Sequence, residues 1–546
     1  MSVVRLSDTL TVSAEQVNET AAQLGVKVPD GDVESYRILL SGLDACVAQI
    51  EAEDDYFPPL DLERFPRTDV HYPTPEENAK EHNAWAYKVH IASTNPVDQA
   101  GPLAGLTVAV KDNVNIATVP SLLGTDIFAE PYIPEYDATI VTRLLRAGAT
   151  IVGKSACENF SLSPNSFTNA HANVQHPLAP GYSAGGSSSG SAALLTGDKP
   201  IVDLAIGGDQ GGSIRLPASY CGIVGLKPTF GLVPYTGIAP LSSIVDHTGP
   251  MTTNVLDNAK LLSAIAGKDG LDDRQLDAPN FGLDYYTPLL EYLEDPKAAV
   301  KGMRIGLLKE SLEVHVLDPR VRDKVKGAAE LFKALGAEVV DVSIPMHLLG
   351  PTIWTVANRQ AVAELALRGQ NPVRHGVHDT PLTRKLAHWT QEMFEKTQLH
   401  NPAVTASFLG GQFVRETYPG ITDKAINLSR KLRDTYEAAF AAYNVDVLLL
   451  PCTPTIGNYT FKLEDSVFAK AAKTVGVTLN TTPMNVSGHP AICIPMGMLP
   501  IIEAGREQDA HIKLPIGMQI MGGLWQEAKI YRAALAFEKS YDWREL

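Results

Sequence analysis

A glycine-rich loop that leads into a serine is the clearest sign of chemistry in this sequence of 546 residues. The stretch IGGDQGGSIR, residues 206–215, follows an apolar segment and precedes a helix that we expect to begin at Ser213. Gly211 and Gly212 allow backbone conformations in which successive N–H groups converge on one point. A serine hydroxyl beside such N–H groups could act as a nucleophile with an oxyanion hole in the same loop. The spacing fits neither a nucleotide-phosphate loop nor the G-x-S-x-G turn of another hydrolase class.

A serine nucleophile needs a base, and the sequence offers both histidines and lysines. Lys111 follows the apolar segment LTVAV, so its ammonium group starts at the end of a predicted buried strand, where sites form in parallel sheets. Burial would lower its pKa and make the neutral amine a base. Lys154, in VGKSACEN, ends a second such strand and is the direct alternative. The histidines that lie in loop-like segments without a recognisable triad motif are His171, His176, His247 and His489. For His489 no carboxylate partner is apparent, and we interpret it as part of the loop structure.

A second serine-rich stretch, AGGSSSGSAALL at residues 184–195, lies upstream of the first. By composition alone it is a flexible linker. Its abrupt change to apolar residues at 192–195 instead predicts a rigid turn that enters a buried helix.

Taken together, these stretches resemble the amidase signature family. LAGLTVAVKDNVN, GATIVGKSACENFS, AGGSSSGSAALL, GGDQGGSIRLPASYCGIVGLKPT and NVSGHPAICIP occur in the family's order over about residues 100–546. The sequence of these motifs is most similar to that of bacterial amidases that act on small aliphatic and aromatic amides. The resemblance implies a Ser–cis-Ser–Lys triad, an acyl-enzyme intermediate, and neither a metal nor another cofactor.

Carried over position by position, the resemblance makes Ser213 the nucleophile and Lys111 the base. It makes Ser187 the bridging serine, because GGSSSGS at residues 185–191 matches the common G-G-S-S-G-G-S with one glycine replaced by Ser189. A fixed backward count from the nucleophile would select Ser189 instead. We choose Ser187, since the segment TGDKPIVD between the two motifs is longer than usual.

The remaining predicted site residues lie in the same two stretches. The backbone N–H groups of Gln210, Gly211, Gly212 and Ser213 would form the oxyanion hole, and Ser188 would lie close to the site.

Three residues around the nucleophile have competing interpretations. Asp209 and Arg215 flank the loop with opposite charges, which predicts an ion pair that clamps it, although Arg215 could instead bind a substrate carboxylate. Cys221 is a possible thiol nucleophile, but in ASYCGIVG it is more typical of a small buried apolar residue.

The composition is that of a globular protein, with 45% hydrophobic and 20% charged residues. A net charge of −16 argues against nucleic acid or an anionic membrane as a partner. We expect no membrane span, because no apolar run of about 18 residues exists. The first residues lack the pattern of a secretory signal, so we expect a cytoplasmic protein. Five scattered cysteines without metal-site spacing predict free thiols.

The residue pattern predicts an α/β fold: a large mixed, mainly parallel sheet with helices on both faces. A helix over 137–149, with Asp137 as its N-cap, separates two of the apolar strands. Residues 1–90 are predicted as an N-terminal helical region with an extended connector at 54–83, and 91–546 as the catalytic domain. Within that domain 351–444 is rich in helix, and its part at 354–413, with the loop at 235–241, is expected to shape the acyl pocket.

Two helices dominate the predicted N-terminal region. One starts with a capping box of Ser13 and Gln16. The second, from about Asp32, carries an apolar stripe over residues 33–50 that suggests packing on the main domain or a homodimer interface.

The predicted function is hydrolysis of the C–N bonds of small carboxylic amides through a Ser213 acyl-enzyme, with carbamates or esters as secondary substrates. The alternative is an amidotransferase subunit that releases ammonia from glutamine for a partner enzyme. A non-enzymatic scaffold would lack a triad member, and none is missing here.

Overall fold

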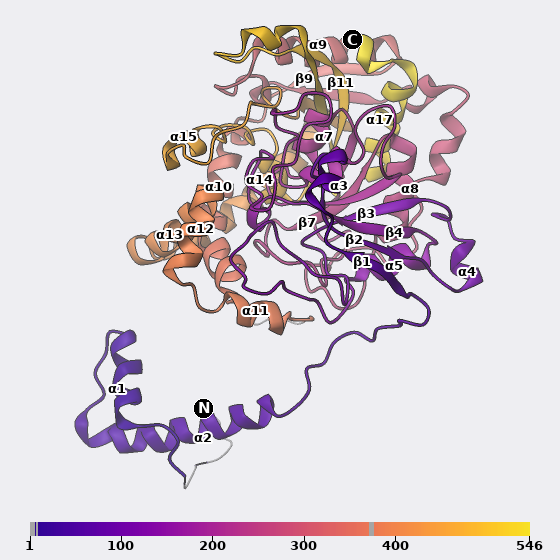
Figure 1. Ribbon diagram of the computed structural model, residues 1–546. Coiled ribbons are helices and arrows are strands. Elements are labelled where there is room, and N and C mark those ends of the chain that lie inside the picture. The colour runs from indigo at the N-terminus through magenta and orange to yellow at the C-terminus, as the bar shows by residue number, and fades with distance from the viewer. Residues whose placement is uncertain (1–5, 7–8, 371–375) are drawn as a thin grey trace. The chain divides into compact units, whose positions relative to one another are not determined.

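The computed structural model describes residues 6, 9–370 and 376–546 (Figure 1). It contains two compact units, Met1–Phe57 and Pro58–Leu546. The first unit holds helix α1 (Ala14–Gln23), which starts with the predicted capping box, and helix α2 (Val33–Glu51). The apolar side chains on one side of α2 remain exposed within this unit.

The second unit starts earlier than the predicted boundary at residue 90. Two strands, β1 (Arg67–His71) and β2 (Trp85–Ile91), lie in the region predicted as helical with an extended connector, and both belong to the main sheet. The central residues of β1 are exposed at the sheet edge, so this strand carries no apolar pattern that would have indicated it.

The sheet has twelve strands in the order β1-β2-β4-β3-β5-β7-β6-β11-β12-β10-β8-β9. The remaining strands are β3 (Thr107–Lys111), β4 (Thr150–Ser155), β5 (Leu204–Asp209), β6 (Val224–Lys227), β7 (His247–Thr252), β8 (Arg304–Leu308), β9 (Glu338–Val342), β10 (Val447–Pro451), β11 (Ala491–Pro500) and β12 (Lys513–Gly522).

The α/β class and the mixed sheet are as predicted, but the description "mainly parallel" is wrong. Among the described strands, parallel pairing joins β4, β3 and β5 in one group and β10, β8 and β9 in another. All the other pairings are antiparallel, and they are the more numerous. Strands buried on both faces have similar apolar sequences in either orientation, so the sequence pattern did not distinguish them.

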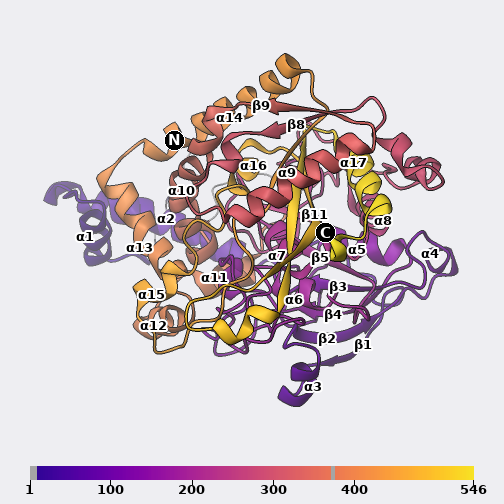
Figure 2. The same cartoon turned by 90° about the horizontal axis from the view of Figure 1, so that it is seen from above.

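The helices of the second unit cover both faces of the sheet (Figure 2). They are α3 (Pro75–Lys80), α4 (Pro96–Gln99), α5 (Thr139–Arg146), α6 (Ser189–Ala193), α7 (Arg215–Cys221), α8 (Val255–Ile265), α9 (Pro319–Ala334), α10 (Gly350–Ala361), α11 (Thr380–Leu386), α12 (Gln391–His400), α13 (Pro402–Thr417), α14 (Ile421–Tyr443), α15 (Val467–Ala472), α16 (Thr482–Ser487) and α17 (Glu527–Ser540). None of the helices that the structure describes has the length and apolar content needed to span a bilayer.

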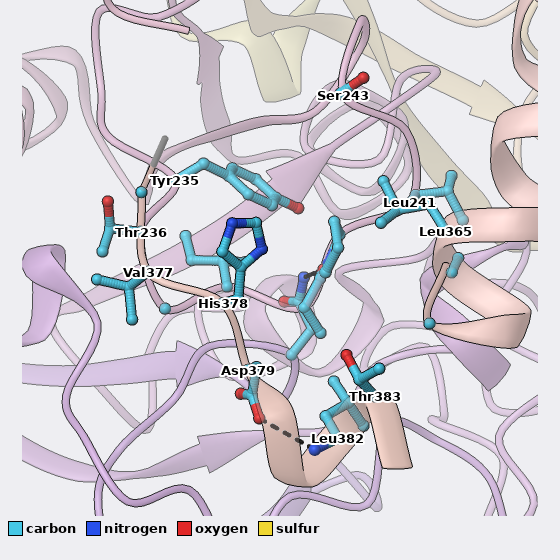
Figure 3. A pocket seen from close by; sticks show the side chains of 18 of the residues that line it. Tyr235, Thr236, Leu241, Ser243, Leu365, Val377, His378, Asp379, Leu382 and Thr383 are labelled. Carbon is cyan, nitrogen blue, oxygen red and sulfur yellow. Dashed lines mark hydrogen bonds between the residues drawn. The ribbon is translucent and has the colours of Figure 1, made fainter. Parts of the chain in front are cut away.

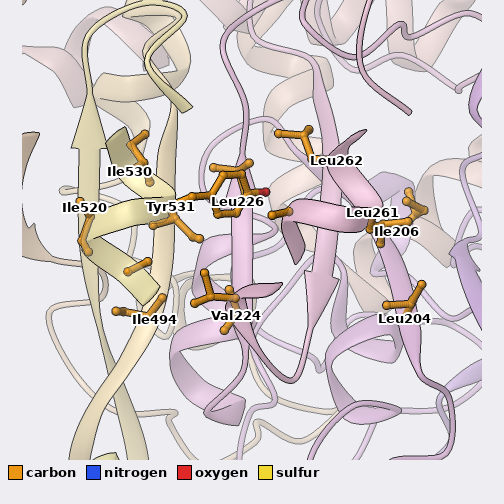
Figure 4. Close-up of a cluster of buried hydrophobic side chains, with 14 of the residues drawn as sticks. Leu204, Ile206, Val224, Leu226, Leu261, Leu262, Ile494, Ile520, Ile530 and Tyr531 are labelled. Carbon is orange, nitrogen blue, oxygen red and sulfur yellow. The ribbon is translucent and has the colours of Figure 1, made fainter. Parts of the chain in front are cut away.

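Side-chain alternation along the strands decides which residues face the site. Large apolar side chains of β5, β6, β11 and β12 meet those of α8 and α17 on one face (Figure 4). On the other face, small side chains such as Ala109 of β3 and Ala205 of β5 pack against α6 and α7. Because side chains alternate along a strand, Lys111 points to the same face as Ala109, and Asp209 to the same face as Ala205.

Candidate active site

Lys111 ends β3 as a fully buried side chain and makes one short contact with a serine. Its Nζ donates a hydrogen bond of 2.8 Å to Ser187 Oγ. Burial lowers the pKa of Lys111 to about 8, because the uncharged amine needs less solvation than the ammonium. About a tenth of this lysine is therefore the neutral base at pH 7, and about half at pH 8.

Ser187 lies in a tight turn before α6, where the peptide bond between Gly186 and Ser187 is cis. A Cβ on Gly186 would come within 2.6 Å of the Ser163 carbonyl oxygen, so only glycine fits there. The Ser187 carbonyl accepts the Glu158 N–H at 3.1 Å. The serine-rich stretch is thus a packed turn with defined partners and not a flexible linker.

Ser188 connects this turn to the loop that carries Ser213. Its N–H donates to the Ser213 carbonyl at 3.3 Å. Its hydroxyl donates to the Gly208 carbonyl and accepts from the Gly208 N–H, each at 3.1 Å. The two predicted catalytic serines therefore lie on segments that are hydrogen-bonded to each other.

Ser213 is buried and lies just before α7, in the loop that follows β5. The carbonyl of Gln210 accepts from Trp354 Nε1 at 2.6 Å, and that of Gly211 accepts from Thr481 Oγ1 at 2.7 Å. These two hydrogen bonds fix the orientation of the peptide groups that follow Gln210 and Gly211. The N–H of Gly212 donates to Asp209 Oδ1 at 2.7 Å and is therefore not free to bind an oxyanion.

The ion pair predicted beside the nucleophile is present. Arg215 Nε donates to Asp209 Oδ2 at 2.9 Å, and both side chains are fully buried. The same guanidinium also donates to the Thr481 carbonyl at 3.0 Å and to Asn485 Oδ1 at 2.8 Å. Although burial acts to raise it, the charge of Arg215 and the hydrogen bonds from Arg215 and Asn485 hold the pKa of Asp209 below its usual range. Arg215 is thus fully buried and bonded both to the loop and to two residues of a distant segment.

The alternative bases have other partners. Lys154 forms an ion pair of 3.2 Å with Asp112 and also donates to Ser121. His489, for which the sequence suggested no carboxylate, lies 2.9 Å from Glu437 Oε1. The other histidines contact backbone carbonyls of different residues: His171 with Thr125, His176 with Tyr220, and His247 with Val245. Cys221 is buried, and burial raises the pKa of its thiol to about 12, which disfavours a thiolate nucleophile.

Glu158 was not predicted as a site residue, yet it lies beside the turn that holds Ser187. Its carboxylate accepts from Ser189 Oγ at 2.6 Å, from Thr168 N–H at 2.7 Å and from Thr168 Oγ1 at 2.6 Å. Burial raises the pKa of Glu158 to about 7. Ser189, the competing candidate for the bridging serine, is therefore a partner of this carboxylate.

A cavity of about 140 Å³ opens beside the loop and is lined by both Asn113 and Gln210. Figure 3 shows the Tyr235 ring on one side of it and Leu382 and Thr383 of α11 on another. The lining includes the predicted loop at 235–241. Its apolar members include Leu123, Phe160, Ile238, Leu241, Leu365, Leu382 and Leu386.

The helical region expected to shape the pocket does so only in part. From this region the cavity wall includes Leu365, Ala366, Gly369, Gly376, Val377, His378, Asp379, Leu382, Thr383 and Leu386. Trp354 contacts the carbonyl of Gln210 in the loop before Ser213 instead, and Phe413 is exposed.

Comparison with known proteins gives the family. A model of the amidase family matches residues 74–531. The chain belongs to the amidase signature family. This amidase-family enzyme is 37% identical over 472 residues to an enantioselective amidase of Rhodococcus rhodochrous, a match that covers 85% of this chain and 84% of that one. It is 35% identical over 446 residues to a glutamyl-tRNA(Gln) amidotransferase subunit of Synechococcus sp. strain CC9311, covering 81% of this chain and 84% of that one.

Solved structures give the same family assignment for this enzyme. The peptide amidase of Stenotrophomonas maltophilia superposes with a TM-score of 0.61 at 28% identity, covering 80% of this chain and 83% of that one. A glutamyl-tRNA(Gln) amidotransferase subunit of Thermotoga maritima superposes with a TM-score of 0.64 at 25% identity, covering 84% and 88%. The chain is thus an amidase signature hydrolase, and its relatives include both amidases and amidotransferase subunits.

Proposed function

We propose that this enzyme hydrolyses small carboxylic amides to the acid and ammonia or an amine through an acyl-enzyme on Ser213. The observation that carries the proposal is the 2.8 Å hydrogen bond between Lys111 Nζ and Ser187 Oγ, made by a buried lysine whose pKa is lowered to about 8. A neutral lysine that contacts one serine can remove a proton from a second serine, with the first serine passing the proton on. Ser213 supplies that second serine, on a loop bonded to the same turn.

In the acylation step, neutral Lys111 accepts the proton of Ser187, and Ser187 accepts the proton of Ser213. Ser213 Oγ then attacks the amide carbon as its proton leaves. The negative charge on the former carbonyl oxygen is bound by the N–H groups of Gln210, Gly211 and Ser213. Loss of one such donor typically costs about 100–1000-fold in rate.

The same three residues return the proton in the second half of the reaction. Lys111 donates through Ser187 to the leaving nitrogen, the C–N bond breaks, and the amine departs. Water then attacks the ester on Ser213 while the relay accepts its proton, which releases the acid. Carbamates and esters fit this route, since the acyl-enzyme forms with other leaving groups too.

The deciding experiment is product release by the purified chain alone on acetamide, benzamide, a carbamate and an ester. We expect ammonia from the simple amides without a partner protein. Ser213→Ala should lower kcat by about 10⁶-fold, as removal of a catalytic serine does elsewhere, while its circular dichroism spectrum stays unchanged. Release of ammonia from glutamine only when a partner protein is added would favour an amidotransferase subunit instead.

A further inference from the structure

Two buried amide side chains line the cavity with their carbonyl oxygens unpartnered. Asn113 Oδ1 and Gln210 Oε1 are buried, and neither accepts a hydrogen bond from any residue that the structure describes. Their NH₂ groups do have acceptors: Gln210 Nε2 donates to Tyr235 Oη at 2.8 Å, and Asn113 Nδ2 lies 3.5 Å from the Ala239 carbonyl. With the NH₂ groups directed at these acceptors, the two carbonyl oxygens are the polar atoms of these side chains that remain without a partner.

Both side chains lie close to the proposed catalytic residues. An ideal Cβ on Gly208 would lie 3.4 Å from Gln210 Nε2 and 3.5 Å from Lys111 Nζ, so these two side chains end next to the same glycine. Asn113 follows Lys111 by two residues along the chain. The backbone of Gln210 belongs to the loop proposed to bind the oxyanion. Both residues therefore line the cavity at the side nearest Lys111 and the loop that carries Ser213, which is where we expect the scissile amide of a substrate to bind.

A buried acceptor without a partner is unfavourable, and a ligand that supplies an N–H group satisfies it. We propose that Asn113 Oδ1 and Gln210 Oε1 accept hydrogen bonds from the N–H groups of the scissile amide. This inference rests on the proposed amide hydrolysis and names the group that is recognised, a primary amide or an amide that keeps one N–H. An ester offers no such hydrogen and leaves both oxygens unpartnered.

Asn113 and Gln210 act in the step in which the nitrogen leaves the substrate. The C–N bond breaks, and the nitrogen takes the proton that Ser213 lost, delivered from Lys111 through Ser187. The two oxygens keep the hydrogens already on the nitrogen directed toward themselves, so that the nitrogen lone pair faces Ser187. Neither amide side chain gains or loses a proton. Asn113 and Gln210 thus select amides over esters and orient the leaving group.

The test compares kcat/KM for benzamide and for methyl benzoate, which share one acyl group. In Asn113→Ala and in Gln210→Ala we expect the amide-to-ester ratio to fall about 10-fold, the usual effect of one lost hydrogen bond. General damage to the oxyanion loop slows both substrates and cancels in the ratio. Asn113→Asp keeps an acceptor oxygen and should retain most of the ratio, which provides a second variant if Asn113→Ala does not fold.

Asn358→Ala is the matched control. Asn358 is another buried asparagine with an unpartnered Oδ1, but it lies outside the cavity lining, so its replacement should leave the ratio unchanged. An unchanged ratio in both Asn113→Ala and Gln210→Ala, with benzamide and methyl benzoate both hydrolysed by the unaltered enzyme, would overturn the inference and leave the proposed function standing. If the unaltered enzyme hydrolysed no amide, the proposed function itself would fail, and the inference with it.

Discussion

Ser189 donates its hydroxyl hydrogen to the buried carboxylate of Glu158 across 2.6 Å. Ser187, two residues earlier, instead accepts a hydrogen bond from Lys111 at 2.8 Å. The two candidates for the bridging serine thus have partners of opposite charge. Of the two, only Ser187 contacts Lys111, the residue that we propose as the base.

This difference predicts unequal effects of two matched substitutions. Ser187→Ala removes the proton path between Lys111 and Ser213 and should lower kcat by about 10²–10⁴-fold. Ser189→Ala removes one of several hydrogen bonds to Glu158 and should lower kcat by less than about 10-fold. Steady-state kinetics on benzamide measures both. A larger loss in Ser189→Ala than in Ser187→Ala would show that the assignment of the bridging serine is wrong.

The lowered pKa of Lys111 predicts the pH dependence. The amine acts as a base only when neutral, so kcat/KM should rise as pH increases through about 8 and level off above it. The Glu158 carboxylate raises the pKa of Lys111 through its negative charge, although burial dominates. Glu158→Gln removes that charge and should move the midpoint of the pH profile to lower pH.

Glu538→Gln serves as the control for this shift. Burial raises the pKa of Glu538 to about 7, as it does for Glu158, but Glu538 is not among the charges that act on Lys111. Its replacement should leave the midpoint in place. A profile that moved equally in both variants, or in neither, would contradict the role of Glu158 beside Lys111.

The clamp between Arg215 and Asp209 predicts a loss of stability. Arg215→Met leaves the buried Asp209 carboxylate without its counter-charge and should lower the free energy of unfolding by about 3–5 kcal/mol. Urea unfolding followed by fluorescence measures the change. The double variant Asp209→Leu with Arg215→Met removes both charges and should recover part of it. Unchanged stability, together with a raised KM for substrates that carry a carboxylate, would favour the alternative role of Arg215.

The exposed side of α2 predicts self-association. Within their own unit, Leu43 is 59% and Ile50 75% exposed. We propose that this side packs against a second copy of the chain, and light scattering should then give twice the chain mass of 58.8 kDa. Leu43→Glu with Ile50→Glu should give the single-chain mass, while the control Gln49→Glu on the same helix should not. A chain that is a monomer before any substitution would exclude this interface.

The position of Lys111 could be predicted from the sequence because it ends a short apolar strand, and β3 ends there. The glycine and serine motifs likewise indicated the turn at Ser187 and the loop before Ser213. These features are local, so a few neighbouring residues are enough to specify them.

Contacts between distant segments could not be predicted in this way. Glu158 meets Ser189 across 31 residues, and no periodic pattern connects them. Asp137 was expected to cap α5, but that helix has Ala138 at its N-cap. The Asp137 carboxylate instead accepts from the Ala117 N–H at 2.8 Å and pairs with Arg67. A capping residue in the sequence competes with every other donor that the fold brings near it.

The hydrogen bond from Trp354 to the Gln210 carbonyl has a consequence for how new substrate ranges could arise in this enzyme. Trp354 lies on α10, at the start of the helix-rich segment that further on supplies part of the cavity wall. Exchanging that whole segment for one from a relative would alter acyl preference and remove a support of the catalytic loop in the same step. Substitutions in α11 that leave Trp354 in place can change acyl preference without removing the support of the loop. Trp354 and α11 thus act on two separate properties, the support of the loop and the shape of the cavity.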